Sequence, residues 1–334
     1  MKVLHIGKKG NMERFSAPDS FLREVTTVDM PMNLPAEEYV KAASDADFII
    51  TDAIGHIPGE LIRQMPHLRS IHSEGVAYNA IDVAAATECG VYVCHSAGMN
   101  AMAVAEQALL LMTGLLRDVV QNDAAVRQGR QIQVKEGYMQ NSNLLELADC
   151  QIGLVGYGDI ARCVARLLHA YGVPDIIYYK RHPLTPAEEE SEGVRYLPLD
   201  ELLAASDIVS LHLPVTPETT GMADRHFFSQ MRPHSYFINT ARGELVDDAA
   251  LIEALSSGRL AGAGLDTLDN EPVQRNHPLL NLPDELARHL LLSPHIGGIT
   301  AASFRRSYAM IWEDIQTVAA GHVPARAVNQ PQRS

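Results

Sequence analysis

The sequence predicts an α/β fold made of two domains, each built around a doubly wound parallel sheet. With 334 residues, the chain is too long for one ordinary hydrophobic core. Short apolar runs alternate with helical patterns over most of the length, which is typical of a parallel sheet covered on both faces. One long helical pattern interrupts this alternation, which begins again at Cys150.

The first hundred residues contain four apolar runs that we expect to be buried strands, at Val3–Ile6, Phe48–Thr51, Ser70–His72 and Val91–Cys94. Helical patterns lie between them at Ala36–Ala46, Gly59–Met65 and Asp82–Glu88. Apolar residues then keep helical spacing from Asn100 to about Arg127, which predicts one long helix that bridges the domains. The following stretch, Gln128–Ser142, is polar and aperiodic, so we expect a loop there.

The second alternation predicts a dinucleotide-binding type of domain. Its six expected strands are Gln151–Val155, Ile176–Tyr179, Ile208–Leu211, Tyr236–Asn239, Gly262–Leu265 and Leu290–Leu292. The helices expected between them include Asp159–Tyr171, Leu199–Ala205, His226–Met231 and Asp248–Ser256. The tail, Ala301–Ala320, has the pattern of one more amphipathic helix.

Composition and charge exclude several classes of protein. The chain has 27 Lys and Arg against 41 Asp and Glu, a net charge of −14, which disfavours nucleic acid and anionic membranes as partners. The four cysteines have neither metal-site nor disulfide spacing, so we expect no metal and a reducing compartment. The first residues enter a strand pattern directly, without a signal peptide, and the longest apolar run, Ala108–Leu116, is too short to span a bilayer. We therefore expect a cytoplasmic protein.

A glycine-rich turn follows the first strand of the second alternation. Residues 156–161 read GYGDIA, which fits the G-x-G-x-x-G/A pattern between an apolar strand and a helix. Gly156 permits a tight turn, Gly158 lets the backbone of Asp159 and Ile160 approach a pyrophosphate, and Ala161 allows close packing. The alternative is a turn that only connects two elements, but the strand–turn–helix context favours a dinucleotide.

The next strand ends at a position that meets the adenosine ribose in dinucleotide-binding domains. NAD-specific proteins place Asp or Glu there, whereas this sequence has Lys180 and Arg181. Two cations would pair with the 2′-phosphate of NADP, so we expect NADP(H) to be preferred and NAD(H) to be possible. The alternative is a pair of solvated surface cations.

Three charged residues follow three expected strands of the second alternation. Arg242, Glu271 and His295 come after the strands that end at Asn239, Leu265 and Leu292. Each residue taken alone could have no chemical role, because surface Arg, loop Glu and structural His residues are common. Together they form the set that a hydroxy-acid dehydrogenase needs. Arg holds a carboxylate, His transfers a proton, and Glu orients the His and favours its protonated form.

Several segments resemble the D-isomer-specific 2-hydroxyacid dehydrogenase family over nearly the whole chain. They are EGVAYNAID (74–82), VAEQ (104–107), the glycine turn, SDIVSLHLP (206–214), NTARGELVD (239–247) and the segments of Glu271 and His295. Lys180-Arg181 is similar to the NADPH-preferring glyoxylate and hydroxypyruvate reductase branch. The chain departs from the family pattern at Leu268, where an aromatic residue is common, and at Asp149, where Gly is common.

The resemblance implies a Rossmann-type dinucleotide domain, residues 100–298, inserted into a discontinuous flavodoxin-like substrate domain, residues 1–99 and 299–334. It implies that Arg242 binds the substrate carboxylate together with the backbone of Val76 and Ala77. It makes His295 the acid/base and Glu271 its partner, and it implies a homodimer through the long-helix region. The cofactor contacts that it implies come from Gly156, Gly158, Asp159, Ile160, Lys180, Arg181, His212, Pro214, Thr240, Ala241, Asp266 and Gly298.

The resulting hypothesis is an oxidoreductase that reduces a small anionic 2-oxo acid to a D-2-hydroxy acid. Two alternatives stay open. One is oxidation of another small anion, such as formate or phosphite. The other is a nucleotide-sensing binding protein or corepressor that keeps the fold.

Overall fold

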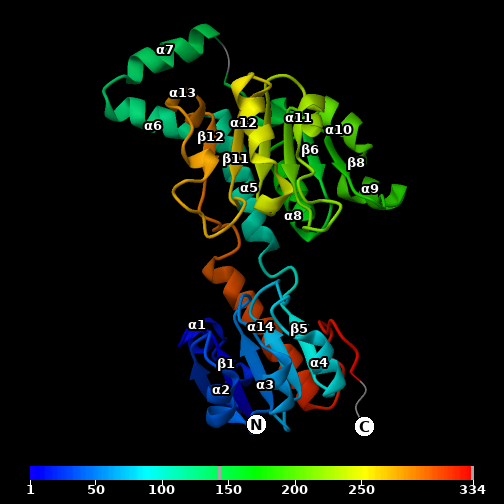
Figure 1. Ribbon diagram of the computed structural model, residues 1–334. Helices are drawn as coiled ribbons and strands as arrows, with labels where there is room; N and C mark the ends of the chain where they lie inside the picture. The colour runs from blue at the N-terminus through cyan, green and yellow to red at the C-terminus, as the bar shows by residue number, and fades with distance from the viewer. Residues whose placement is uncertain (142–143, 332–334) are drawn as a thin grey trace. The chain divides into compact units, whose positions relative to one another are not determined.

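The computed structural model describes residues 1–141 and 144–331. The chain separates into two compact units (Figure 1). Unit 1 comprises Met1–Asn100 and Ile299–Ser334, and unit 2 comprises Ala101–Gly298. The α/β fold class with parallel sheets is confirmed.

Unit 1 is built on a five-stranded parallel sheet with the order β2-β1-β3-β4-β5. Its strands are β1 (Lys2–Ile6), β2 (Thr26–Met30), β3 (Phe48–Thr51), β4 (Ser70–Ser73) and β5 (Tyr92–His95). This is the flavodoxin-like order, in which the strand sequence reverses between β1 and β3. Polar residues that follow the strands therefore gather at one edge of the sheet.

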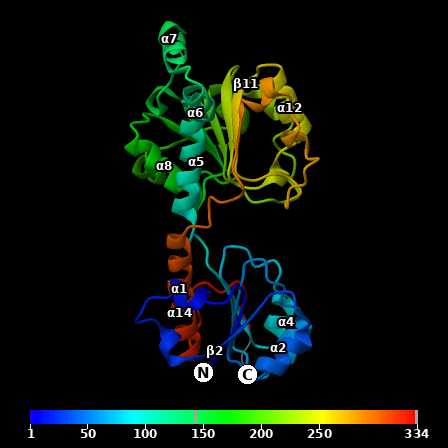
Figure 2. The same cartoon turned by 90° about the vertical axis from the view of Figure 1, so that its left-hand side faces the viewer.

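Helices cover both faces of the unit 1 sheet (Figure 2), and alternate residues of its strands belong to the core on opposite faces. Leu4 and Ile6 belong to a core cluster that also contains residues of α2 (Ala36–Ala43), α3 (Gly59–Arg63) and α4 (Val83–Glu88). Val3 belongs to the opposite cluster, with residues of α1 (Asn11–Phe15) and α14 (Ala301–Ala319). The helix α14 thus covers one face of a sheet whose strands come from the other end of the chain.

Unit 2 is built on a seven-stranded parallel sheet with the order β12-β11-β10-β9-β6-β7-β8. Its strands are β6 (Ile152–Val155), β7 (Ile176–Tyr179), β8 (Arg195–Tyr196), β9 (Ile208–Leu211), β10 (Ser235–Asn239), β11 (Leu260–Leu265) and β12 (Leu290–Leu292). This is the Rossmann order extended by one strand, with its reversal between β6 and β9.

Helices also cover both faces of the unit 2 sheet (Figure 2). One core cluster joins residues of α5 (Ala101–Leu116) and α8 (Asp159–Ala170) to the sheet. The other joins α10 (Leu199–Ala205), α11 (Arg225–Gln230) and α12 (Asp248–Ser256). The remaining helices are α6 (Val119–Arg127), α7 (Gln131–Asn141), α9 (Pro186–Glu192) and α13 (Asp284–Ala287).

The structure corrects the sequence prediction in the long-helix region. The single helix predicted to reach Arg127 is divided into α5 and α6, because Asp118 has left-handed backbone angles, with φ of 45°. The loop predicted from Gln128 is largely the helix α7, while Ser142 lies outside the described residues. None of the residues of α7 is buried, so its sequence carries no apolar period that could have revealed a helix. The strands β2 and β8 were also missed.

Candidate active site

The glycine turn lies at the carboxyl end of β6, beside the point where the strand order reverses. Gly156 has φ of +92°, and a Cβ atom there would come 2.4 Å from the carbonyl oxygen of His212. A Cβ atom on Gly158 would meet nothing within 4 Å, so the start of α8 at Asp159 faces open space. Both glycines are therefore where a pyrophosphate could approach the positive end of a helix.

Four buried polar atoms lie on the last residues of β9 or just beyond β9, β10 and β11, with no hydrogen-bond partner within residues 1–141 and 144–331. They are the Oγ of Ser210, the Nε2 of His212 and the Oγ1 atoms of Thr240 and Thr267. A buried polar group without a partner costs about 1–3 kcal/mol, and a bound ligand could supply the missing bonds. Burial lowers the pKa of His212 to about 4, so its ring is neutral at physiological pH. This donor and acceptor set suits a nucleotide.

The two cations after β7 differ in their surroundings. Lys180 is half-buried, and its Nζ donates to the carbonyl oxygen of Tyr157 at 3.3 Å. Arg181 is exposed. Hydrogen bonds from Thr185 are the main cause that lowers the pKa of Glu188 on α9, and the positive charges of Arg162 and Lys180 contribute. A phosphate bound here would therefore share these cations with an acidic helix.

His295 and Glu271 form a hydrogen-bonded pair. The Nδ1 of His295 lies 2.5 Å from the Oε2 of Glu271, and the Oε1 of Glu271 accepts from the backbone N–H of Leu268 at 2.9 Å. The His295 side chain is 44% exposed, and its Nε2 has no partner in the described chain. One ring nitrogen is thus held by a carboxylate while the other is free to exchange a proton with a ligand.

Asp266 holds the turn that carries His295. Its carboxylate accepts from the hydroxyl of Ser293 at 2.5 Å and from the N–H groups of Ile296 at 3.1 Å and Gly297 at 2.9 Å. Its own carbonyl accepts from the N–H of His295, whose φ is +54°. A carboxylate has about four lone-pair positions, so one is left for the cofactor contact that the family resemblance implies for Asp266.

The loop after β10 carries Arg242, whose side chain is exposed with Nη1 donating to the carbonyl of Ala241 at 2.7 Å. Asn239 bonds both sides of the loop: its Oδ1 accepts from the N–H of Ala241, and its Nδ2 donates to the carbonyl of Arg242. A Cβ on Gly243 would lie 2.0 Å from the backbone of Leu268. The Arg242 and Glu271 loops are therefore neighbours at the same sheet edge.

Sequence reasoning assigned no role to three of these polar residues. Asn239 holds the Arg242 loop, and Gln107 donates to Ser293, which in turn donates to Asp266. Gln107 and Asn239 lie within family-like segments, which was the available signal. The remaining predicted positions, Pro214 and Gly298, also follow β9 and β12.

In unit 1, the first four residues of the loop after β4 have their carbonyl groups bonded. The carbonyls of residues 74–77 accept, in order, from Ser307 Oγ, the N–H of Ser96, His95 Nδ1 and Ser73 Oγ. The N–H groups of Val76 and Ala77 have no acceptor within the described residues, and Val76 is exposed. Two adjacent backbone donors are therefore available to an anion.

Outside these loops, no described helix is long and apolar enough to cross a membrane, and no group of three or more His, Cys, Asp or Glu in the described chain could hold a metal ion. The Rossmann order, the glycine turn with its open helix start and the His295–Glu271 pair define a class of protein, the dehydrogenases that use a nicotinamide dinucleotide.

The comparisons with known proteins give the family. A sequence model described as "D-isomer specific 2-hydroxyacid dehydrogenase, NAD binding domain" matches residues 109–297, more than half of the chain. The chain therefore belongs to the D-isomer specific 2-hydroxyacid dehydrogenase family, and it is an NAD(P)-dependent dehydrogenase.

Relatives and solved structures are similar over nearly the full length. A glyoxylate reductase of Thermococcus litoralis is 33% identical over 301 residues, covering 90% of this chain and 88% of the relative. The glyoxylate reductase of Aeropyrum pernix is 34% identical, covering 89% and 87%. The NAD-complexed D-isomer specific 2-hydroxyacid dehydrogenase of Lactobacillus delbrueckii ssp. bulgaricus has a TM-score of 0.82 at 26% identity, covering 98% and 100%.

Proposed function

We propose that the protein reduces a small 2-oxo acid to a D-2-hydroxy acid and prefers NADPH to NADH. The observation that carries this proposal is the His295–Glu271 pair at the carboxyl edge of the dinucleotide-type sheet, with the loop of Arg242 beside it. Relatives named glyoxylate reductase support a small substrate.

The side chains divide the work. A reduced nicotinamide, when bound, would supply the hydride for the carbonyl carbon of the substrate. The Nε2 of His295 donates the proton to the carbonyl oxygen, while Glu271 holds Nδ1 and stabilises the charged ring. The guanidinium of Arg242 binds the substrate carboxylate with two hydrogen bonds. We also assign the free N–H groups of Val76 and Ala77 to the substrate carboxylate.

The cofactor would be held by unit 2. Gly156, Gly158 and the first turn of α8 would bind the pyrophosphate, and the unpartnered atoms of His212 and Thr240 would bond to the nucleotide. Lys180 and Arg181 would pair with a 2′-phosphate. Ala101–Gly298 is then the dinucleotide-binding domain, and the remaining residues form the substrate-binding domain.

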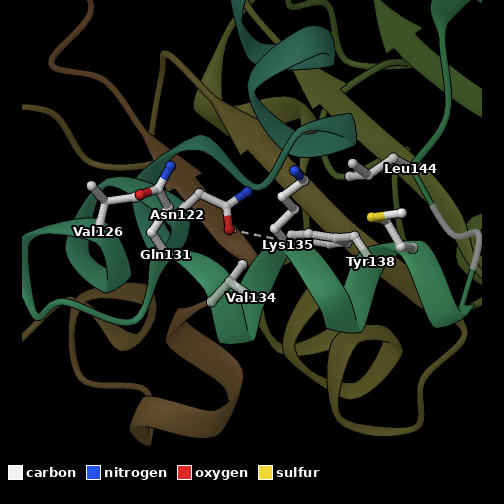
Figure 3. A pocket seen from close by; sticks show the side chains of 8 residues that line it. Asn122, Val126, Gln131, Val134, Lys135, Tyr138 and Leu144 are labelled. Carbon is white, nitrogen blue, oxygen red and sulfur yellow. Dashed lines mark hydrogen bonds between the residues drawn. The ribbon is translucent and has the colours of Figure 1, made fainter.

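We further propose a homodimer in which a second copy covers α6 and α7. Apolar side chains of Val126, Val134, Met139 and Leu144 line a groove of about 480 Å³ there (Figure 3). The Met139 residue is 70% exposed and Val126 is 55% exposed. A helix of 11 residues with none of them buried lacks the packing that stabilises short helices, and a second copy would provide it.

The homodimer is tested by sedimentation of Val126→Glu with Met139→Glu, which should be monomeric. Val323→Glu is the matched control, because Val323 is an exposed apolar residue of unit 1, at 67%. A doubly substituted protein that sediments like the wild type contradicts the dimer surface.

The function is tested with a panel of 2-oxo acids, including glyoxylate, hydroxypyruvate and pyruvate, each with NADPH and with NADH. We expect turnover, with the lower KM for NADPH. Absence of turnover with every 2-oxo acid, together with nucleotide binding by calorimetry, would replace the proposal with a nucleotide-sensing binding protein.

A further inference from the structure

A buried polar cluster in unit 1 lies at the start of the loop that contains Val76 and Ala77. Its centre is Glu74, the residue after β4, which is 2% exposed. The other members are His5 on β1, Asp29 on β2, Asn11 on α1 and Tyr308 on α14. Five separate elements therefore contribute to a cluster centred on a carboxylate that has no part in the proposed proton transfer.

Three donors bond to the carboxylate of Glu74. Its Oε1 lies 2.7 Å from the Nε2 of His5 and also accepts from the hydroxyl of Tyr308, while its Oε2 accepts from Asn11 at 3.4 Å. The Nδ1 of His5 lies 2.5 Å from Asp29. Because both ring nitrogens of His5 face carboxylates, both must donate, and the ring is a cation. Burial lowers the pKa of His5, but the hydrogen bonds and charges of Glu74 and Asp29 outweigh burial and raise it.

The backbone of Glu74 is held as firmly as its side chain. Its N–H donates to the carbonyl of Thr51 at 2.7 Å, and its carbonyl accepts from Ser307 at 2.5 Å. Ser307 also bonds to Ser96, whose N–H donates to the carbonyl of Gly75. Glu74, the first residue of the loop, is thus held through its N–H, its carbonyl and its side chain. Gly75 is held through its carbonyl and through its N–H, which donates to Ser73 Oγ at 3.2 Å, whereas Val76 and Ala77 are held by their carbonyls alone.

Stability gives little reason for an ionised cluster at this position. Burying charges costs several kcal/mol per ion before their attraction is counted, and apolar residues of similar volume are often equally stable. An apolar core cluster packs on each face of the sheet around the polar cluster. Unlike apolar residues, hydrogen-bonded ions can select one conformation of the chain that carries them.

We propose that Glu74 is a positioning residue for the substrate, which sets the backbone N–H groups of Val76 and Ala77 in the orientation that binds the carboxylate of a small 2-oxo acid. This inference rests on the proposed function. The side chains of the cluster act through the backbone and do not touch the substrate.

The closing experiment compares Glu74→Gln and Tyr308→Phe with a matched control, Asp314→Asn. Asp314 is also a buried carboxylate of unit 1, on the same helix as Tyr308, and it pairs with His72 at 3.0 Å and with Arg326. It has no bond to the loop of residues 74–77 among the described contacts. The full chain is assayed with glyoxylate and NADPH, and thermal unfolding is recorded for each variant.

We expect the KM for glyoxylate to rise about tenfold in Glu74→Gln, the effect of losing one charge-assisted bond. Tyr308→Phe removes one of the donors to Glu74 and should raise the same KM about threefold, from the loss of one neutral hydrogen bond. In both variants kcat and the KM for NADPH should stay within about twofold of the wild type, because loss of uniform substrate binding leaves kcat unchanged. Asp314→Asn should lower the melting temperature without raising the glyoxylate KM.

Two outcomes overturn the inference. One is an unchanged glyoxylate KM in either folded variant. The other is an equal rise in Asp314→Asn, which would mean that any weakening of unit 1 has this effect. Should Glu74→Gln fail to fold, Tyr308→Phe decides alone. If the wild type reduces no 2-oxo acid, the proposed function itself has failed, and that result is visible before any variant is made.

Discussion

Two histidines, one in each unit, have buried ring nitrogens in opposite environments. His5 in unit 1 is bonded through both ring nitrogens to carboxylates, and its pKa is raised. His212 in unit 2 has a buried Nε2 with no partner in the described chain, and burial lowers its pKa to about 4. The first is a cation and the second is neutral, although both lie on or next to a strand of a parallel sheet.

The difference extends to the polar residues around them. In unit 1 the side chains of Asn11 and Tyr308 both bond to Glu74, and the exceptions are the unpartnered hydroxyls of Ser20 and Thr51. In unit 2 several buried hydroxyls at the strand ends are left open. Satisfied polar groups fix the backbone, whereas open ones are where a ligand can complete the bonding. The carboxyl edge of a parallel sheet can therefore position a loop in one unit and bind a ligand in the other.

The strongest test of the ligand-binding edge in unit 2 is His295→Ala. A positioned proton donor contributes on the order of 10²–10⁴ in rate, so kcat for 2-oxo acid reduction should fall by about that factor. The measurement is steady-state kinetics at saturating NADPH. His322→Ala, at an exposed position of unit 1, is the control. A kcat within twofold of the wild type would remove His295 from proton transfer.

The contrast between the histidines also predicts opposite pH dependences of stability. An unfolded histidine titrates near 6.5, so between pH 6.5 and 4 the unfolded chain binds a proton at His212 that the folded protein does not. Stability from this residue is present above pH 6.5 and is lost as pH falls, by up to about 3 kcal/mol. For His5, the stabilisation is complete below pH 6.5 and is lost as pH rises through its raised pKa.

Urea unfolding across pH 4.5–9 checks both signs. The difference in the free energy of unfolding between the wild type and His212→Asn should change with pH only below about pH 6.5. The corresponding difference for His5→Asn should change only above that pH. If these two differences depended on pH in the same way, the environments of His5 and His212 would not be opposite.

Arg242→Ala should have the next largest effect. Each charge-assisted hydrogen bond contributes about 1.5–3 kcal/mol, so kcat/KM for the 2-oxo acid should fall about ten- to a hundredfold. The KM for NADPH should change little and serves as the internal control. Should the substrate carboxylate bind elsewhere, kcat/KM will keep its wild-type value.

The smallest expected effect concerns the cofactor. Lys180 and Arg181 should give NADPH a preference of roughly tenfold in kcat/KM, mostly through KM, and salt should reduce it. Lys180→Asp with Arg181→Ser should reverse the preference. Equal KM values for NADPH and NADH at low salt would mean that the side chains turn to solvent and leave the phosphate unbound.

Most strands and the positions of the charged residues were predictable. Apolar runs alternate with helical patterns, and in a parallel sheet all carboxyl ends meet at one edge, so Arg242, Glu271 and His295 could be placed there from spacing alone. The helix α7 was not predictable, because none of its residues is buried. The edge strand β2 is only partly buried, so its pattern is weak.

The supporting contacts were beyond sequence reasoning for a different reason. The bond from Gln107 to Ser293 joins residues that are 186 positions apart, and the bond from Tyr308 to Glu74 joins residues 234 apart. A charged residue such as Glu74 is normally exposed, so its burial at the centre of unit 1 leaves no trace in composition or periodicity.

The division of the chain has a consequence for its synthesis. All strands of the unit 1 sheet leave the ribosome within the first hundred residues, but α14, which covers one face of that sheet, follows only after the whole of Ala101–Gly298. Until then Val3, Phe48 and Ile50 lack the cover of Ile311 and Trp312. The nascent protein therefore carries an uncovered apolar sheet through the making of an entire second domain, at about 5–20 residues per second. During that interval the first-made unit is the one that needs protection from aggregation, and it is the last to become complete.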